Sequence, residues 1–74
     1  MPKITNKQLY KVLYDKSTAT TAYVGRASAG SSEASPVWQI FRITKISGLL
    51  DKQYADGNVN FDNVWDNRET LSYG

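Results

Sequence analysis

The stretch Val37–Ile46 (VWQIFRITKI) constrains the fold more than any other part of the chain. It is rich in β-branched and aromatic side chains and contains neither Gly nor Pro, which favours a strand. Alternation places the apolar residues on two faces: Trp38, Ile40 and Ile46 on one, and Val37, Phe41 and Ile43 on the other. Because both faces are apolar, the pattern predicts a strand buried on two sides over part of its length, as in a barrel or a sandwich.

The N-terminal part of the chain predicts a hairpin. Gln8–Tyr14 alternates between two faces and is predicted to be a strand, although Thr5 and Gln8 also match a helix-capping box, which keeps a helix open for this segment. A polar, turn-like stretch follows, and Thr21–Ala27 is predicted to be the second strand of the hairpin. Ser28–Pro36 is rich in Gly and Ser and is expected to be a surface loop. This loop would be either a plain link between strands or an arm that becomes ordered against a partner.

The C-terminal half predicts shorter elements. We expect a turn at Ser47-Gly48, a strand at Leu49–Ala55, a turn at Asp56-Gly57-Asn58, a short strand through Val59 and Phe61, an irregular or single-turn helical segment at 62–67, and a last strand at Thr70–Tyr73. The expected fold of residues 1–74 is therefore one mostly β domain. It would be a small antiparallel β-barrel or sandwich of about five to six strands with an irregular C-terminal segment.

Composition removes several classes of function. The chain has no Cys and no His, so it lacks thiolate chemistry, Cys-based zinc sites, and the commonest general base and metal ligand. We therefore expect a protein that is not an enzyme and uses no cofactor. The start has no apolar signal region and no apolar run is long enough for a membrane span, so we expect synthesis in the cytoplasm and no membrane partner.

The formal net charge of +2 is unevenly distributed. Residues 1–16 hold four Lys and one Asp, a net charge of +3, whereas residues 51–74 hold one Lys, one Arg, four Asp and one Glu, a net charge of −3. Such ends can attract each other within one fold or between neighbouring copies. A small domain of 74 residues with a limited core also gains from neighbours that cover its surface.

Two acidic patterns suggest chemistry, and both are weak. Asp62 and Asp66 are four residues apart, but a domain this small rarely forms the cleft that a glycosidase carboxylate pair needs. Four residues have the spacing of the first ligands of a calcium loop: Asp56, Asn58, Asn60 and Asp62. The pattern then fails, because Phe61 stands where the turn needs Gly and Asn67 where a bidentate Glu belongs. We assign no catalytic, cofactor-binding or metal residues.

Basic and aromatic residues keep nucleic-acid binding open as an alternative. A positive face could be formed by Lys3, Lys7, Lys11, Arg42 and Lys45, with stacking by Tyr10 and Tyr14. The small net charge and the acidic C-terminal third argue against nucleic acid as a partner.

The other aromatic residues are expected in the core or at an interface. The expected core aromatics are Trp38, Tyr23, Tyr54 and Phe61. Trp65, in the polar run DNVWDN, either anchors a partner pocket or folds back over the end of the sheet. Arg68 is expected to pair locally with Asp66 and Glu69. The candidate partner-contact residues are Trp65, Asp66, Arg68 and Tyr73.

Three patches of the sequence carry a resemblance: AYVGRASAG (22–30), PVWQIFRIT (36–44) and YADGNVNFDNVWDNRETLSY (54–73). They resemble a group of short, uncharacterised proteins encoded in tailed-phage and prophage genomes, which run Y-I-G-x-A, then W-x-I-x-R-I, then A-D-G … F-D-N-x-W-D-x-R-x-x-L-x-Y. The matching positions are Tyr23, Gly25, Ala27, Trp38, Ile40, Arg42, Ile43, Ala55, Asp56, Gly57, Phe61, Asp62, Asn63, Trp65, Asp66, Arg68, Leu71 and Tyr73. Val24 departs from the usual Ile.

The resemblance implies a virion-associated structural protein and assigns no activity. The expectation is a bacteriophage protein that decorates or cements the capsid, or serves as a tail or fibre adaptor. It would bind other virion proteins and further copies of itself, and would be made in the host cytoplasm before assembly into the virion. The alternatives are a basic β-barrel that binds nucleic acid and a knob that binds carbohydrate or the host surface.

Overall fold

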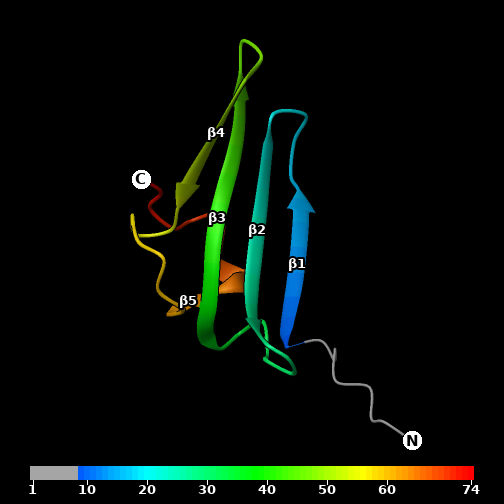
Figure 1. Ribbon diagram of the computed structural model, residues 1–74, viewed down its shortest axis with the longest axis vertical. Coiled ribbons are helices and arrows are strands. Elements are labelled where there is room, and N and C mark those ends of the chain that lie inside the picture. Colours follow the sequence, from blue (N-terminus) through cyan, green and yellow to red (C-terminus); the bar gives the residue numbers. More distant parts are fainter. Residues whose placement is uncertain (1–8) are drawn as a thin grey trace, which may run out of the picture.

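A computed structural model describes residues 9–74 of the chain and has a mostly β fold. Four strands form an antiparallel sheet in the order β1-β2-β3-β4: β1 (Tyr10–Lys16), β2 (Thr21–Ser28), β3 (Pro36–Ile46) and β4 (Leu49–Tyr54). A two-residue strand, β5 (Asn63–Val64), pairs with the start of β3, and a single 3₁₀ turn, η1 (Trp65–Asn67), follows it. Figure 1 shows η1 behind β2 and β3, so the C-terminal segment crosses one side of the sheet.

Strands β1 to β4 lie in the sheet in their order along the chain, and a tight turn connects β3 to β4. Ser47 and Gly48 both have positive φ, 50° and 82°, which matches the two-residue turn that best suits strand twist and joins β3 to β4. Asp56 and Gly57 also have positive φ and turn the chain away from the sheet after β4. Both turns were predicted from the sequence and are confirmed.

Strand alternation gives the sheet two different faces. The covered face carries the odd-numbered residues of β1, β2 and β4 and the even-numbered residues of β3, as the register pairs Leu13 with Gly25 and Gly25 with Ile40. The open face carries the opposite set, since Tyr14 pairs with Val24 and Val24 with Phe41. The two faces are used differently by the rest of the chain.

The core lies between the covered face and the C-terminal segment. The buried cluster consists of Tyr23, Ala27, Trp38, Ile40, Ala55 and Trp65, with Leu13, Leu71 and Tyr73 packed against it. The Trp38 and Trp65 rings lie 5.9 Å apart between centroids, and Tyr23 and Tyr73 lie 5.8 Å apart. The covering segment returns to the sheet where Tyr73 forms a bridge with Ala55. One layer of strands and one irregular layer thus enclose a small, aromatic core.

Several predictions from the sequence are confirmed. The fold is mostly β and antiparallel, and β1 is a strand over the described part of the ambiguous N-terminal segment, which excludes the helix there. The segment that precedes residue 9, including Thr5 and Gln8, lies outside the described residues. The 3₁₀ turn η1 agrees with the expected single-turn helical segment.

Other predictions were wrong. Among residues 9–74 the sheet is open, because β1 and β4 do not pair with each other, so the expected barrel is not observed in this part of the chain. Val59 and Phe61 do not form a strand; β5 follows them, and the predicted last strand is reduced to the bridge at Tyr73. Phe61 is exposed and packs against Tyr10 on the open face, because the chain turns to that side before β5. Tyr54 likewise lies on the open face beside Phe41.

The loop between β2 and β3 is tied to the core. The Trp38 Nε1 donates to the Ser32 carbonyl at 2.9 Å, and the Asp66 amide donates to the Glu33 carbonyl at 3.1 Å. Lys11 Nζ donates to the Ser31 carbonyl at 3.3 Å. The loop therefore satisfies donors of β1, β3 and η1 and closes one end of the core.

Candidate docking surface

Trp65, the strongest candidate for a partner anchor, is part of the protein's own core. Its side chain lies on the covered face, is 5% exposed, and packs against Trp38 and the backbone of Gly25. A Cβ atom added to Gly25 would lie 2.5 Å from the Trp65 ring, so the absence of a side chain at this position lets the ring approach the sheet. Two placements were considered for Trp65, an exposed anchor for a partner and a ring folded back over the sheet, and the structure has the second.

Arg68 and Tyr73 hold the C-terminal segment on the covered face. Arg68 Nε donates to Asp15 Oδ2 at 2.9 Å, so its ion-pair partner is in β1 and not, as predicted, at Asp66 or Glu69. The Tyr73 hydroxyl donates to the Arg68 carbonyl at 2.7 Å, and burial raises the pKa of Tyr73 to about 12. Asp66 is exposed. Contact of these residues with a partner remains a prediction.

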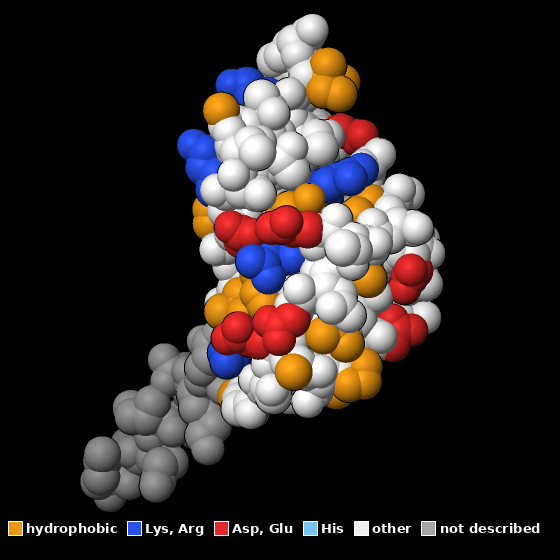
Figure 2. All heavy atoms as spheres, turned by 180° about the vertical axis from the view of Figure 1, so that it is seen from behind, with side chains coloured by type: hydrophobic (Ala, Val, Ile, Leu, Met, Phe, Trp, Pro, Cys, Tyr) orange, Lys and Arg blue, Asp and Glu red, His pale blue; other side chains and the backbone are white. Residues whose placement is uncertain are grey.

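Charges of both signs lie on the side of the molecule that carries the C-terminal segment. Figure 2 shows basic and acidic side chains close together there. Besides the pair of Arg68 with Asp15, Lys11 lies 3.8 Å from Glu33. The expected attraction between a basic N-terminal part and an acidic C-terminal part therefore takes a different form, because in the Arg68 pair the C-terminal residue supplies the positive charge.

The open face carries charges of one sign. Its strand residues include four cations, Lys16, Arg26, Lys45 and Lys52, and none of these strand positions, all of them described, holds Asp or Glu. Between the cations lie the large apolar and aromatic side chains of the same face: Tyr10, Val12, Tyr14, Val24, Phe41, Ile43, Leu50 and Tyr54. Alternation along the strands has separated the charges, so the open face is basic and apolar.

The two halves of the open face differ. Near the β5 end, Phe61 stacks on Tyr10 with centroids 6.3 Å apart, Arg26 lies 4.8 Å from the Tyr10 centroid, and Gln39 donates to the Val59 carbonyl at 2.8 Å. The segment before β5 therefore covers this half. At the other end, near the β1–β2 and β3–β4 turns, Tyr14 and Leu50 are each 66% exposed.

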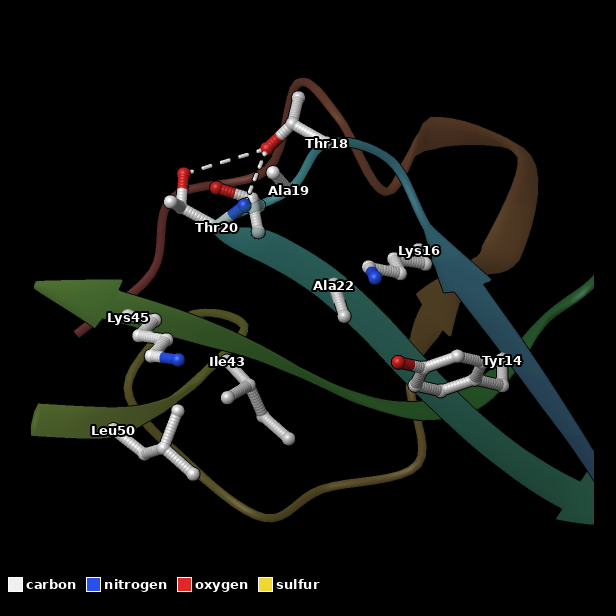
Figure 3. Close-up of a pocket in the computed structure, with 10 residues that line it drawn as sticks. Tyr14, Lys16, Thr18, Ala19, Thr20, Ala22, Ile43, Lys45 and Leu50 are labelled. Atoms are coloured by element: carbon white, nitrogen blue, oxygen red, sulfur yellow. Dashed lines mark hydrogen bonds between the residues drawn. The ribbon is translucent and has the colours of Figure 1, made fainter. Parts of the chain in front are cut away.

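A shallow hollow of about 120 Å³ lies in the uncovered half. Figure 3 shows Ala22 and Ile43 beneath it, Tyr14 and Leu50 beside it, and Lys16 and Lys45 at opposite sides. Thr18 and Thr20 border it at the β1–β2 turn, where the Thr20 amide donates to the Thr18 hydroxyl at 3.2 Å. The hollow thus combines an apolar floor with basic sides. It can accept an apolar group, but it lacks the depth of an enzyme cleft.

The geometry of the described residues gives little support to the metal site and the nucleic-acid face considered from the sequence. Within residues 9–74, no three acidic residues are grouped so as to hold a metal ion. Asn58, whose spacing only partly matched a calcium loop, accepts a hydrogen bond from the Asn60 amide at 2.9 Å, which is ordinary turn chemistry. The predicted basic face for nucleic acid is split: Lys45 lies on the open face with Tyr10 and Tyr14, while Lys11 and Arg42 lie on the covered face. Lys3 and Lys7 are outside the described residues.

Comparison of the chain with protein-family models, with curated proteins and with solved structures finds no match. Among the described residues there is no helix long and apolar enough to cross a membrane. The surface therefore has to be interpreted from its own chemistry.

The open face was not predicted from the sequence, although part of its pattern is present there. In Tyr10–Lys16, alternation already grouped Tyr10, Val12 and Tyr14, which the structure places on this face. The missing information was which strand face the C-terminal segment covers. That choice requires the register of β1, β2 and β3 and the position of Trp65, which no local pattern specifies.

Proposed function

We propose that this protein is a structural component of a phage particle that acts by docking on other protein surfaces. The observation that carries the docking role is the unequal covering of the sheet. The C-terminal segment buries one face, whereas large apolar side chains such as Tyr14 and Leu50 remain exposed on the other. An antiparallel sheet that faces water normally presents polar residues there, so exposed apolar residues favour an interface.

Further features support docking. β1 and β4 are edge strands of the described sheet, and an edge strand can pair with a strand of another chain. The phage setting rests on the sequence resemblance alone, and decoration, cement and adaptor roles would all use the same surfaces. Further copies of this chain, or other virion proteins, are the proposed partners.

The experiment that tests this proposal is quantitative mass spectrometry of purified particles from the phage or prophage that encodes the chain. We expect the chain in a fixed, multiple copy number relative to the major capsid protein, and we expect it to stay with the particles through density-gradient centrifugation. A host cytoplasmic protein of similar abundance serves as the control for contamination. If the chain is absent from intact particles, or is no more enriched than the control, the virion role is wrong.

Nucleic-acid binding is the second candidate, and the single sign of charge on the open face favours it. The four cations of this face could contact phosphates. Base stacking has less support, because Lys52 Nζ lies 4.3 Å from the centroid of Phe41 and 5.0 Å from that of Tyr54. The Lys52 ammonium group therefore already lies over both rings, where a base would have to stack. Fluorescence anisotropy with a labelled oligonucleotide at increasing salt tests this candidate; a steep loss of affinity with salt would support it.

A further inference from the structure

We propose that the hollow of the open face binds an acidic protein segment, whose apolar side chain enters the hollow while neighbouring carboxylates meet Lys16 and Lys45. This inference deepens the proposed docking function and rests on it. It names the part of the surface that docks and the chemistry of the partner, which is a protein other than a symmetric second copy.

The floor and walls of the hollow are apolar. Ala22 is buried and Ile43 half-buried, while Tyr14 and Leu50 extend beside them and are largely exposed. The described segments that cover the rest of the sheet do not reach these residues, since Phe61 and Val59 contact the other half of the face. A volume of about 120 Å³ is comparable to one medium-sized apolar side chain. Filling it would remove from water the apolar surface that these residues present to the hollow.

The sides of the hollow are basic. Lys16 and Lys45 lie on opposite sides of it. Lys52, on the neighbouring strand β4, pairs with Ile43 and lies on the same face. The acid nearest along β1, Asp15, points to the covered face and is engaged by Arg68. Asp51, between Leu50 and Lys52, also belongs to the covered face. A partner with negative charge is therefore the complementary one.

Charge also argues against a symmetric dimer through this face. A two-fold axis would place the open face of one copy against the open face of another, with the same four cations on both sides. Like charges that face each other across an interface disfavour it.

The floor of the hollow is aliphatic, and Lys52 lies over the Phe41 and Tyr54 rings of the same face. This arrangement favours a protein side chain over nucleotide bases, because bases bind by stacking on uncovered rings.

The test uses peptide probes and two matched double variants. The probe is the labelled peptide Ac-EEDLFDEE-NH₂; the comparison probes are Ac-EEDGSDEE-NH₂, which keeps the charge without the apolar pair, and a ten-nucleotide oligo(dT). The test variant is K16E/L50S, on the open face. The control variant is K11E/L49S, which makes the same chemical changes on the same two strands but on the covered face, where Leu49 is 70% exposed. Binding is measured by anisotropy and mapped by amide chemical shifts of the labelled full chain.

We expect the apolar acidic peptide to shift the amides around Tyr14, Ala22, Ile43 and Leu50. K16E/L50S should weaken its binding on the order of tenfold or more, since it removes a leucine contact that the peptide would bury and reverses a charge. K11E/L49S should change the affinity less than about twofold. The inference is wrong if no saturable binding occurs, if Ac-EEDGSDEE-NH₂ binds equally well, if the shifts map elsewhere, or if oligo(dT) binds the hollow more tightly than the peptide.

The same variants separate this inference from the proposed function. If the wild-type chain is found in particles and K16E/L50S is incorporated equally well, docking stands but does not use the hollow. If K16E/L50S is lost from particles while K11E/L49S is retained, the hollow is the docking site. If the wild-type chain is absent from particles, the virion role fails, and the peptide measurements still decide whether the hollow binds acidic protein.

Discussion

Replacement of Gly25 by alanine tests the packing on which the covered face depends. The added Cβ would lie 2.5 and 2.7 Å from two atoms of the Trp65 ring and 3.3 Å from Trp38. Ordinary contact between carbon atoms is about 3.5–4.0 Å, so the Trp65 ring must move by about 1 Å. Both rings are buried, and Trp38 is fixed by its hydrogen bond to Ser32. The ring therefore cannot move without disturbing the core.

The expected cost can be estimated from overpacking. Extra methylene groups in a well-packed core cost about 1–3 kcal/mol, and the short contacts place this site near the upper end. Alanine recovers about 0.5–1 kcal/mol over glycine in a strand interior, and Gly25 has no positive φ that would add strain. We therefore expect Gly25→Ala to lower the free energy of unfolding by about 2 kcal/mol. For a domain of this size the loss corresponds to a fall in Tm of roughly 8–16 °C.

Urea denaturation, followed by far-ultraviolet circular dichroism, measures this loss. The control is the same substitution in a Trp65→Phe background, where the smaller ring leaves room for the methyl group. There Gly25→Ala should cost less than about 1 kcal/mol, so the two changes should couple by about 1 kcal/mol or more. A neutral or stabilising Gly25→Ala, or an equal cost in both backgrounds, would refute the reasoning that the ring contact makes glycine necessary.

Three further predictions follow from the covered face. Trp65→Ala should lower the free energy of unfolding by about 3–5 kcal/mol, because it empties part of the core; an unchanged urea midpoint would place the ring outside the core. Tyr73 has a folded pKa of about 12 against an ordinary 10, so its contribution to stability is complete below pH 10 and is lost as the pH rises to 12. Tyr73→Phe should reduce this alkaline loss, which urea midpoints measured between pH 9 and 12 would reveal; a loss of unchanged size in this variant would contradict the assignment to Tyr73. Asp15→Asn, which removes the charge facing Arg68, should cost about 1 kcal/mol, and less at about 1 M salt; a cost independent of salt would argue against an ionic contribution.

Local patterns in the sequence were sufficient to predict most elements. Val37–Ile46 alternates between two faces and contains no breaker, and β3 occupies that stretch with one added residue, Pro36. The turns at Ser47-Gly48 and Asp56-Gly57 were also predictable, because each combines a residue that tolerates positive φ with glycine. These features depend on neighbours in sequence, so a single sequence contains the information that specifies them.

The candidate site was far less predictable. Its members come from β1, β2, β3 and β4, and the hollow exists only after the strands adopt their register. Trp65 and Arg68 were predicted as contact residues instead, because their polar neighbours in the sequence suggested exposure. In the structure, Trp65 fills the core and Arg68 pairs with Asp15, 53 residues away along the chain.

The sequence by itself determined that this chain forms antiparallel strands with a tight turn at Ser47-Gly48, and that it lacks the thiol and imidazole groups of many active sites. The tertiary structure alone decided which face of the sheet is covered. That choice depends on the fit of the Trp65 ring against Gly25 and Trp38, which is a contact between distant parts of the chain. By burying one face in this way, the packing left exposed the half of the opposite face that carries Tyr14 and Leu50.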